Sequence, residues 1–399
     1  MKYIFVLIII CYTIYSQWTV QLSGTAKDLW GVSFINENIG LIVGDSGKIL
    51  RTSNGGANWF NIASGTSYWL LSVKFIDANT ALACGDYGII LRSTNTGLNW
   101  TQVASGTDLF LRYINNNGNT CFAVGNDGIA VQSTNGGISW SVVNVCNNIG
   151  NKAVYLISPS NVIISCWQGW IMRTTNSGAN WNCLFTGQSL EGLSFSGNNI
   201  GNIVGFNGRI LRTTNAGQNW FTQDIPGMQN WYFGVQLIND NTGYIVGENA
   251  IILKTTNGGY NWNQQTSGAL GYLYMLYFIN ANTGTIVGNF GTILRTTNGG
   301  SIGLQQIGTE VPDKFSLSQN YPNPFNPNTF IDFAIPKTQM VNLIIYDITG
   351  AIIDVLVREQ LSTGYYRYEY NAEKLSSGVY FYRLETESYS VSRKMIVLK

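Results

Sequence analysis

The sequence of 399 residues contains 22 Lys and Arg against 21 Asp and Glu, which gives a formal net charge of +1. A balance this close to neutral offers no basic field of the kind that binds nucleic acid, so nucleic acid is not an expected partner. Histidine is absent, which removes Ser-His-Asp catalysis and the usual zinc ligands. No cofactor or metal is expected.

The first 16 residues have the features of a cleaved secretory signal peptide. Lys2 precedes an apolar run from Tyr3 to Cys11, and Ser16 supplies a small residue before Gln17. A membrane anchor is the alternative, but the run is short for crossing about 30 Å of hydrocarbon. No long apolar segment follows residue 16, so we expect no transmembrane segment in the mature chain.

Residues 17–300 are organised by seven copies of one motif, whose best copies read Thr/Ser-x-Asn-x-Gly-x-x-Trp. Successive copies are 39 to 42 residues apart, with asparagines at Asn54, Asn95, Asn135, Asn176, Asn215, Asn257 and Asn298. A period of this length indicates stacked supersecondary units. Each unit reads as four short strands, because apolar runs alternate with turns rich in Gly, Asn and Ser. The sequence therefore predicts an all-β fold built on a seven-bladed β-propeller.

The two ends of the repeat array complement each other. The seventh motif stops at Ser301, with no tryptophan and no strand behind it. The missing piece precedes the first blade, where Trp18 to Ser23 matches the strand that follows other motifs, such as Trp59 to Ser64. We therefore predict that the N-terminal strand completes blade seven, which would remove the open strand edges of the array.

The motif resembles the Asp-box, or bacterial neuraminidase repeat, with Asn in place of the usual Asp. Its longer form, from Val43 to Thr52, resembles the propellers of photosystem II assembly factors. The resemblance covers residues 18 to 300. It implies the propeller fold and leaves function open, because propellers with this box include hydrolases, sorting receptors, assembly factors and binding proteins.

The composition changes after a short polar linker predicted at residues 301–314. Charged residues become more frequent over residues 315–399, and three prolines between Tyr321 and Pro327 exclude a central strand there. Alternating apolar residues predict strands beyond this segment, at Asn342 to Tyr346, Ala351 to Val357, Tyr365 to Tyr370, Val379 to Glu385 and Ser390 to Leu398.

Residues 315–399 resemble the type A C-terminal sorting domain of the type IX secretion system over their whole length. The matching segments are Tyr321 to Pro327, Ile345 to Gly350, Leu375 to Tyr382 and Lys394 to Lys399. The resemblance implies a small immunoglobulin-like β-sandwich, the type IX secretion machinery as a partner, and passage through the periplasm to the outer cell surface or beyond. An accessory sandwich with a purely structural role is the alternative.

Five cysteines follow the predicted signal peptide. Cys146 and Cys183 come after motif tryptophans in neighbouring blades, so a disulfide between them is one possibility. The odd number leaves at least one free thiol. Cys84, Cys121 and Cys166 occupy strand positions where small buried side chains are expected.

Carboxylate chemistry is the catalytic option that the composition leaves open. Asp45, Asp86 and Glu248 lie in the hairpins between second and third strands. A glycoside hydrolase needs two carboxyl groups about 5 to 9.5 Å apart, but the repeated position of these residues also suits turn formation. A sialidase-type arginine triad is not supported, because only Arg112 and Arg209 depart from the arginine position that the blades repeat. Enzymatic activity is therefore the alternative.

Aromatic residues outside the motif define a candidate binding face. The connections between blades and the hairpins between second and third strands emerge on one face of such a propeller, whereas the motif turns emerge on the other. Aromatic surfaces with polar groups suit sugar rings or extended peptides; the alternative is that most of these residues fill the core. The predicted ligand-binding residues are Trp30, Trp69, Phe110, Trp167, Trp170, Trp231, Tyr232, Tyr272, Asp45, Asp86 and Glu248.

Together these features predict a secreted or surface-attached propeller that binds an extracellular glycan or protein. A carboxylate-dependent glycoside hydrolase on the same face is one alternative, and a non-catalytic assembly or scaffold protein is the other. The motif residues themselves are interpreted as structural, since Ser, Thr and Asn side chains bond the turn backbone and each motif tryptophan packs between sheets.

Overall fold

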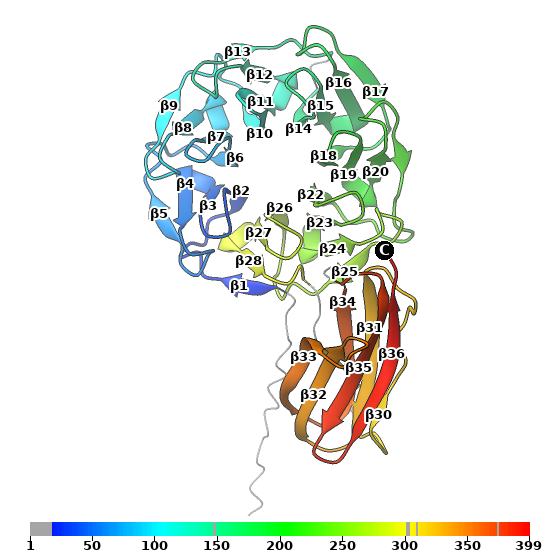
Figure 1. Cartoon of the computed structure of the whole chain (residues 1–399). Coiled ribbons are helices and arrows are strands. Elements are labelled where there is room, and N and C mark those ends of the chain that lie inside the picture. The colour runs from blue at the N-terminus through cyan, green and yellow to red at the C-terminus, as the bar shows by residue number, and fades with distance from the viewer. Residues whose placement is uncertain (1–17, 147–148, 301–303, 309, 373–374) are drawn as a thin grey trace, which may run out of the picture. The chain divides into compact units, whose positions relative to one another are not determined.

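The computed structural model describes residues 18–146, 149–300, 304–308, 310–372 and 375–399. These residues form nine four-stranded antiparallel sheets, seven of which are the blades of a β-propeller within residues 18–300 (Figure 1). The predicted all-β class and the seven-bladed propeller are confirmed. The predicted signal peptide at residues 1–16 lies outside the described residues. No helix within the described ranges has the length and apolarity needed to cross a bilayer.

Each blade runs from an inner strand at the propeller axis to an outer strand at the rim (Figure 1). The inner strands are β2 (Leu29–Phe34), β6 (Leu70–Phe75), β10 (Leu111–Asn117), β14 (Asn151–Leu156), β18 (Leu190–Ser196), β22 (Tyr232–Leu237) and β26 (Leu273–Phe278). The second strands are β3 (Gly40–Gly44), β7 (Ala81–Gly85), β11 (Thr120–Gly125), β15 (Val162–Cys166), β19 (Ile200–Gly205), β23 (Gly243–Gly247) and β27 (Gly284–Gly288).

A single turn of 3-10 helix connects second and third strands in every blade: η1 (Asp45–Gly47), η2 (Asp86–Gly88), η3 (Asn126–Gly128), η4 (Trp167–Gly169), η5 (Phe206–Gly208), η6 (Glu248–Ala250) and η7 (Asn289–Gly291). The third strands are β4 (Lys48–Thr52), β8 (Ile90–Ser93), β12 (Ala130–Ser133), β16 (Trp170–Thr174), β20 (Ile210–Thr213), β24 (Ile252–Thr255) and β28 (Ile293–Thr296). The outer strands are β5 (Phe60–Ile62), β9 (Thr101–Val103), β13 (Ser141–Val142), β17 (Asn182–Phe185), β21 (Phe221–Thr222), β25 (Asn263–Gln265) and β1 (Thr19–Gln21).

The core lies between neighbouring blades rather than inside any one of them. Every residue of β3 is buried, because both faces of this strand are covered. Leu41 and Val43 of blade one pack with Leu70 and Val73 of blade two, and Trp100 of the second motif packs against this cluster. The motif tryptophan therefore wedges between sheets, as predicted.

Strand β1 closes the ring by pairing with β28 in blade seven, with Thr19 opposite Arg295. Trp18 is fully buried beside this strand and contacts Tyr244 and Phe278 edge-on. The predicted closure of blade seven by the N-terminal strand is confirmed.

Side chains of the motif stabilise the turn in which they lie by hydrogen bonding to its backbone. In the first copy, Thr52 Oγ1 donates to Asn54 Oδ1 at 3.0 Å and accepts the backbone N–H of Gly56 at 2.8 Å. Asn54 Oδ1 also accepts the N–H of Asn58. The preceding Arg51 donates from Nε to the carbonyl of Thr96 in the next motif. The motif residues and the repeated arginine are therefore structural.

Residues 304–399 form a separate unit of two sheets around one apolar core. One sheet has the order β29 (Leu304–Gly308), β34 (Gly364–Asn371), β31 (Asn328–Ile335), β30 (Ser316–Leu317). The other has the order β33 (Ile352–Leu361), β32 (Gln339–Tyr346), β35 (Gly378–Thr386), β36 (Ser390–Val397). The predicted two-sheet sandwich is confirmed, and its likeness to immunoglobulin domains stays a prediction.

The boundary of this sandwich differs from the predicted linker at residues 301–314. Leu304–Gly308 forms β29 and pairs with β34, with Leu304 opposite Tyr368. The short polar sequence does not predict a strand by itself. It becomes a strand because its backbone hydrogen bonds are made with β34, about 60 residues further along the chain. Strand β31 (Asn328–Ile335) also went unpredicted, although the proline segment before it forms no regular strand, as expected.

Cys146 and Cys183 form a disulfide between the outer parts of blades three and four, which fulfils the pairing considered from sequence. Cys84, Cys121 and Cys166 are buried free thiols, and burial raises the pKa of each. These three side chains behave as small apolar core residues.

Candidate functional site

One face of the propeller collects the loops that the sequence analysis assigned to it. In each blade the first residue of the 3-10 turn donates its backbone N–H to the carbonyl of the residue just before the inner strand. Examples are Asp45 to Asp28 at 3.0 Å, Trp167 to Gly150 at 2.8 Å and Glu248 to Trp231 at 2.9 Å. The two loop sets are therefore held together, while the motif turns bond the other loops, as Gly55 does with Asn38.

Every inner strand carries a β-bulge at its second residue. The pairing between β2 and β3 skips from Leu29 to Gly31, which leaves Trp30 without a partner. Five other blades skip one residue in the same way, whereas β18 skips both Glu191 and Gly192. A bulge bends the strand and redirects the unpaired side chain. The seven bulged residues are Trp30, Leu71, Arg112, Lys152, Glu191, Phe233 and Tyr274.

All seven bulged residues line one pocket at the propeller axis, with a volume of about 410 Å³. Trp167, Trp231 and Tyr272 from the surrounding loops add to the wall. We call this cavity the axial pocket. A volume of this size accommodates a small ligand or a short stretch of peptide.

Aromatic rings form a continuous arc along one side of the axial pocket. Trp30 stacks on Tyr274 with ring centroids 4.0 Å apart, and Tyr274 contacts Phe233 at 5.7 Å. Phe233 lies 5.1 Å from Trp231, which meets Trp167 edge-on at 6.4 Å. The rings support one another, so the arc is a rigid apolar surface.

Charged groups from blades three, four and five form the wall next to the Trp167 end of the arc. Lys152 Nζ lies 2.9 Å from Glu191 Oε1, and both side chains are almost fully buried. Lys152 also sits 3.9 Å above the ring centre of Trp167. Arg112 donates from Nε to Asn126 Oδ1 at 2.8 Å. Two cations thus face one carboxylate at this wall.

Burial governs the protonation of this charged wall. Burial raises the pKa of Glu191, while the charges of Lys152 and Arg112 oppose the rise. Burial lowers the pKa of Lys152 and of Arg112, and Glu191 opposes both shifts. Each charge therefore depends on its neighbours, so an incoming polar group can compete for them.

The three predicted carboxylates lie around the axial pocket rather than in it. Asp45 Oδ1 accepts the indole N–H of Trp30 at 2.7 Å. Glu248 Oε1 accepts the backbone N–H of Trp231 at 2.9 Å. The pKa of Asp86 is raised, chiefly by burial and also by the negative charge of Asp45. Asp45 and Glu248 therefore orient two pocket residues.

Trp30, Trp167, Trp231 and Tyr272, four of the predicted ligand-binding residues, line the axial pocket. Two other predicted residues contact pocket residues without lining the pocket themselves. Trp69 is 44% exposed and stacks on Trp30 at 6.5 Å. Phe110 lies under the Arg112 guanidinium at 5.0 Å.

Two predicted contact residues take other positions. Tyr232 is fully buried, because it occupies the first position of its inner strand, where other blades place Leu29 or Leu70 in the core. Trp170 starts the third strand and packs on its outer-strand partner Phe185 at 5.1 Å, away from the axis. Neither residue belongs to the pocket.

Sequence reasoning missed six of the seven bulged residues in the pocket, namely Leu71, Arg112, Lys152, Glu191, Phe233 and Tyr274. The sequence feature that could have identified them is their shared position, directly after the buried first residue of each inner strand. That residue differs in chemistry from blade to blade, whereas its neighbours follow the repeat. Its exposure depends on the bulge, which the sequence pattern did not reveal.

The fold and the axial pocket define a seven-bladed propeller of the Asp-box type. The model of the family described as photosynthesis system II assembly factor YCF48 matches residues 11–110 and 184–302, more than half of the chain. The protein therefore belongs to this family. The secretion system C-terminal sorting domain matches residues 319–398, which indicates type IX secretion and export to the cell surface or outside.

Solved structures show the same propeller. YCF48 bound to D1 peptide is 20% identical, with a TM-score of 0.61 over 71% of this chain and 96% of that one. YCF48 from Cyanidioschyzon merolae is 19% identical, with a TM-score of 0.60 over 70% and 98%. An inactive virginiamycin B lyase from Staphylococcus aureus with quinupristin is 14% identical, with a TM-score of 0.62 over 70% and 99%. At these identities the similarity concerns the fold alone. No curated protein matches the chain.

Proposed function

We propose that this exported propeller is a binding protein whose axial pocket receives an extended segment of a partner protein. The observation that carries the proposal is the bulge position, which places seven different side chains around one cavity. An aromatic arc next to a wall formed by Arg112, Lys152 and Glu191 suits a segment with both apolar and polar groups.

The arrangement of the rings favours peptide over glycan. Sugar rings bind on open, flat aromatic faces. Trp30 and Tyr274 cover each other at 4.0 Å, and Trp167 meets Trp231 at 88°. The angled rings leave wedges that suit side chains. One of the similar propellers, YCF48 bound to D1 peptide, also has a peptide as its ligand.

The excess of cations at the charged wall defines the preferred segment. Arg112 and Lys152 carry two positive charges against one negative charge on Glu191. A buried wall with surplus positive charge favours a carboxylate or backbone carbonyls in the bound segment. We expect selected peptides to combine an aromatic or aliphatic anchor with an acidic residue.

The test is binding of the full chain to a random peptide library and, in parallel, to a glycan array. Trp167→Ala removes an aromatic that is 41% exposed, and Tyr260→Ala is the matched control, 84% exposed in a motif turn. We expect enriched peptides whose affinity falls about 30-fold in Trp167→Ala and stays unchanged in Tyr260→Ala. Glycan binding without peptide binding, or equal loss in both variants, would contradict the proposal.

A further inference from the structure

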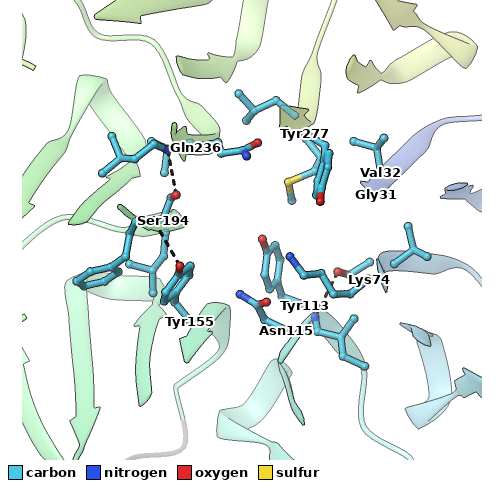
Figure 2. A pocket seen from close by; sticks show the side chains of 18 residues that line it. Gly31, Val32, Lys74, Tyr113, Asn115, Tyr155, Ser194, Gln236 and Tyr277 are labelled. Atoms are coloured by element: carbon cyan, nitrogen blue, oxygen red, sulfur yellow. Dashed lines mark hydrogen bonds between the residues drawn. The ribbon is translucent and has the colours of Figure 1, made fainter. Parts of the chain in front are cut away.

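A second cavity, of about 240 Å³, lies within the central channel of the propeller. We call it the channel site. It shares Tyr113 and Met275 with the axial pocket but is otherwise lined by residues from further along the inner strands. Of the eighteen described residues that line it, Lys74 alone carries a formal charge. Figure 2 shows Lys74 pointing toward the middle of the channel.

Lys74 does not make the hydrogen bond that the equivalent residues of most other blades make to the next blade. The equivalent side chain, at the fifth position of the inner strand, usually bonds the backbone of the next blade. Ser194 Oγ accepts the N–H of Leu237 at 3.0 Å, and Asn115 Nδ2 donates to the carbonyl of Val154 at 3.2 Å. Ser33, Tyr155 and Gln236 make comparable bonds at 2.7 to 3.4 Å.

In blade two a different residue makes the hydrogen bond to the next blade. Ser72 Oγ accepts the N–H of Ile114 at 3.2 Å, which ties blade two to blade three without Lys74. Within the described ranges, Lys74 lies in no ion pair, and its amine stands 5.7 Å from the ring centre of Tyr277. Burial lowers the pKa of Lys74, and no carboxylate offsets that effect. Lys74 is partly buried, so its charge is partly desolvated without a carboxylate to compensate, and an anion in the channel would stabilise it.

Two tyrosines share the channel with Lys74. Tyr113 and Tyr277 direct their hydroxyls into the channel, into which Lys74 also points (Figure 2). Burial raises the pKa of Tyr113 to about 12, so its hydroxyl stays protonated at neutral pH and can donate. The pKa of Tyr277 is raised by burial as well. One ammonium with two hydroxyl donors makes a site for a single negative charge.

We propose that the channel site binds a carboxylate group through Lys74, Tyr113 and Tyr277. A single lysine matches a monoanion, whereas a phosphate dianion is usually held by a fork of arginines or by several cations. The cavity holds a short carboxylate with accompanying water, since one water occupies about 30 Å³. The carboxylate can belong to a small molecule or to an acidic residue of a peptide, and the two sources are separated experimentally.

The test follows Lys74 directly by NMR of the full chain carrying 13Cε-labelled lysine, with Lys74→Met to assign the resonance. Acetate is the small-molecule probe, sodium chloride at equal ionic strength is the control salt, and the exposed Lys27 is the internal control. We expect a saturable shift of the Lys74 resonance with acetate, little shift with chloride and none at Lys27. Followed through the methyl resonance of acetate instead, binding to the Lys74→Met variant should be at least about tenfold weaker.

Short peptides provide the second arm. A glutamate-containing peptide and its glutamine counterpart are added separately to the labelled chain. A Lys74 shift with the glutamate peptide alone assigns the site to a peptide carboxylate, and a shift with acetate assigns it to a free one. The proposal is overturned if neither acetate nor the glutamate peptide moves the Lys74 resonance, or if chloride moves it equally.

Discussion

The motif turns and the bulge positions are both repeated seven times, yet they differ in what varies. The motif turns keep one hydrogen-bond pattern in every blade, as Thr52 with Asn54 and Ser93 with Asn95 illustrate. The bulge positions keep one backbone geometry while their side chains differ, from Trp30 to Lys152. This contrast indicates that the repeated side chains stabilise the ring, whereas the unrepeated ones line the axial pocket that we propose as the binding site.

The largest loss of stability is expected where the ring closes. Trp18→Ala removes a fully buried indole that packs on Tyr244 and Phe278 and donates to Gln265 Oε1 at 2.9 Å. We expect about 3–5 kcal/mol lower free energy of unfolding, measured in guanidinium. Val20→Ala, on the same strand but 59% exposed, is the control and should cost less than about 0.5 kcal/mol. Equal effects would argue that β1 does not close the ring.

The disulfide should make the next largest contribution to stability. It is an exception to the contrast between repeated and unrepeated residues, because it stabilises the ring but occurs in one pair of blades. Cys146 and Cys183 are 37 residues apart, and closing such a loop contributes about 2–4 kcal/mol. Replacing both with Ala should lower the melting temperature and remove its dependence on dithiothreitol. A melting temperature that still responds to reductant would place the labile bond elsewhere.

The charged wall tests whether unrepeated residues also affect stability, because Lys152 and Glu191 form an ion pair with each other. Lys152→Met leaves Glu191 buried without its partner and should cost about 3 kcal/mol. Adding Glu191→Gln should recover about 1–3 kcal/mol in a double-mutant cycle of unfolding free energies. Additive single effects would show that the two side chains do not interact.

One motif asparagine should have a small effect confined to stability. Asn95 Oδ1 accepts Ser93 Oγ and the N–H of Asn99, both at 2.9 Å. Asn95→Ala should cost about 1 kcal/mol, as loss of a comparable cap does. Peptide affinity should stay unchanged. A marked loss of affinity would mean that the motif face takes part in binding.

The smallest expected change has the opposite sign. Burial lowers the pKa of Lys74 below its ordinary value of 10.5, so the unfolded chain binds more protons between the two values. Stability should therefore rise with pH across that interval. Lys74→Met should be about 1 kcal/mol more stable at neutral pH, with the gain disappearing near pH 10.5. A destabilised variant with the same pH profile as the parent protein would contradict this.

The sequence predicted what the repeats encode and missed what depends on partners distant in the chain. The motif spacing was enough to predict seven blades, and the orphan strand at Trp18 was enough to predict the closure. Tyr232 was misjudged because an aromatic replaces leucine at a core position, and only the register of β22 reveals this. Arg112 was noted as outside the repeated arginine position, but its place in the pocket depends on the bulge in β10.

The sandwich teaches the same lesson. Five of its strands follow from alternation, whereas β29 is a strand only because β34 supplies its ladder. Likewise Glu191 became a pocket residue because β18 bulges beside Lys152 of the preceding blade. The local hydrophobic pattern of the sequence predicts the strands. Which side chains reach the propeller axis depends on bulges and on contacts between blades, which the pattern does not show.

The most direct test of the division between repeated and unrepeated residues is a crossed comparison of Asn95→Ala and Trp167→Ala, in which unfolding free energy and peptide affinity are both measured. The account predicts that Asn95→Ala loses about 1 kcal/mol of stability with unchanged affinity, and that Trp167→Ala loses affinity about 30-fold while its stability falls by no more than about 1–2 kcal/mol, the contribution of its contact with Lys152. The reverse pattern, or one in which both variants lose both properties, would contradict it.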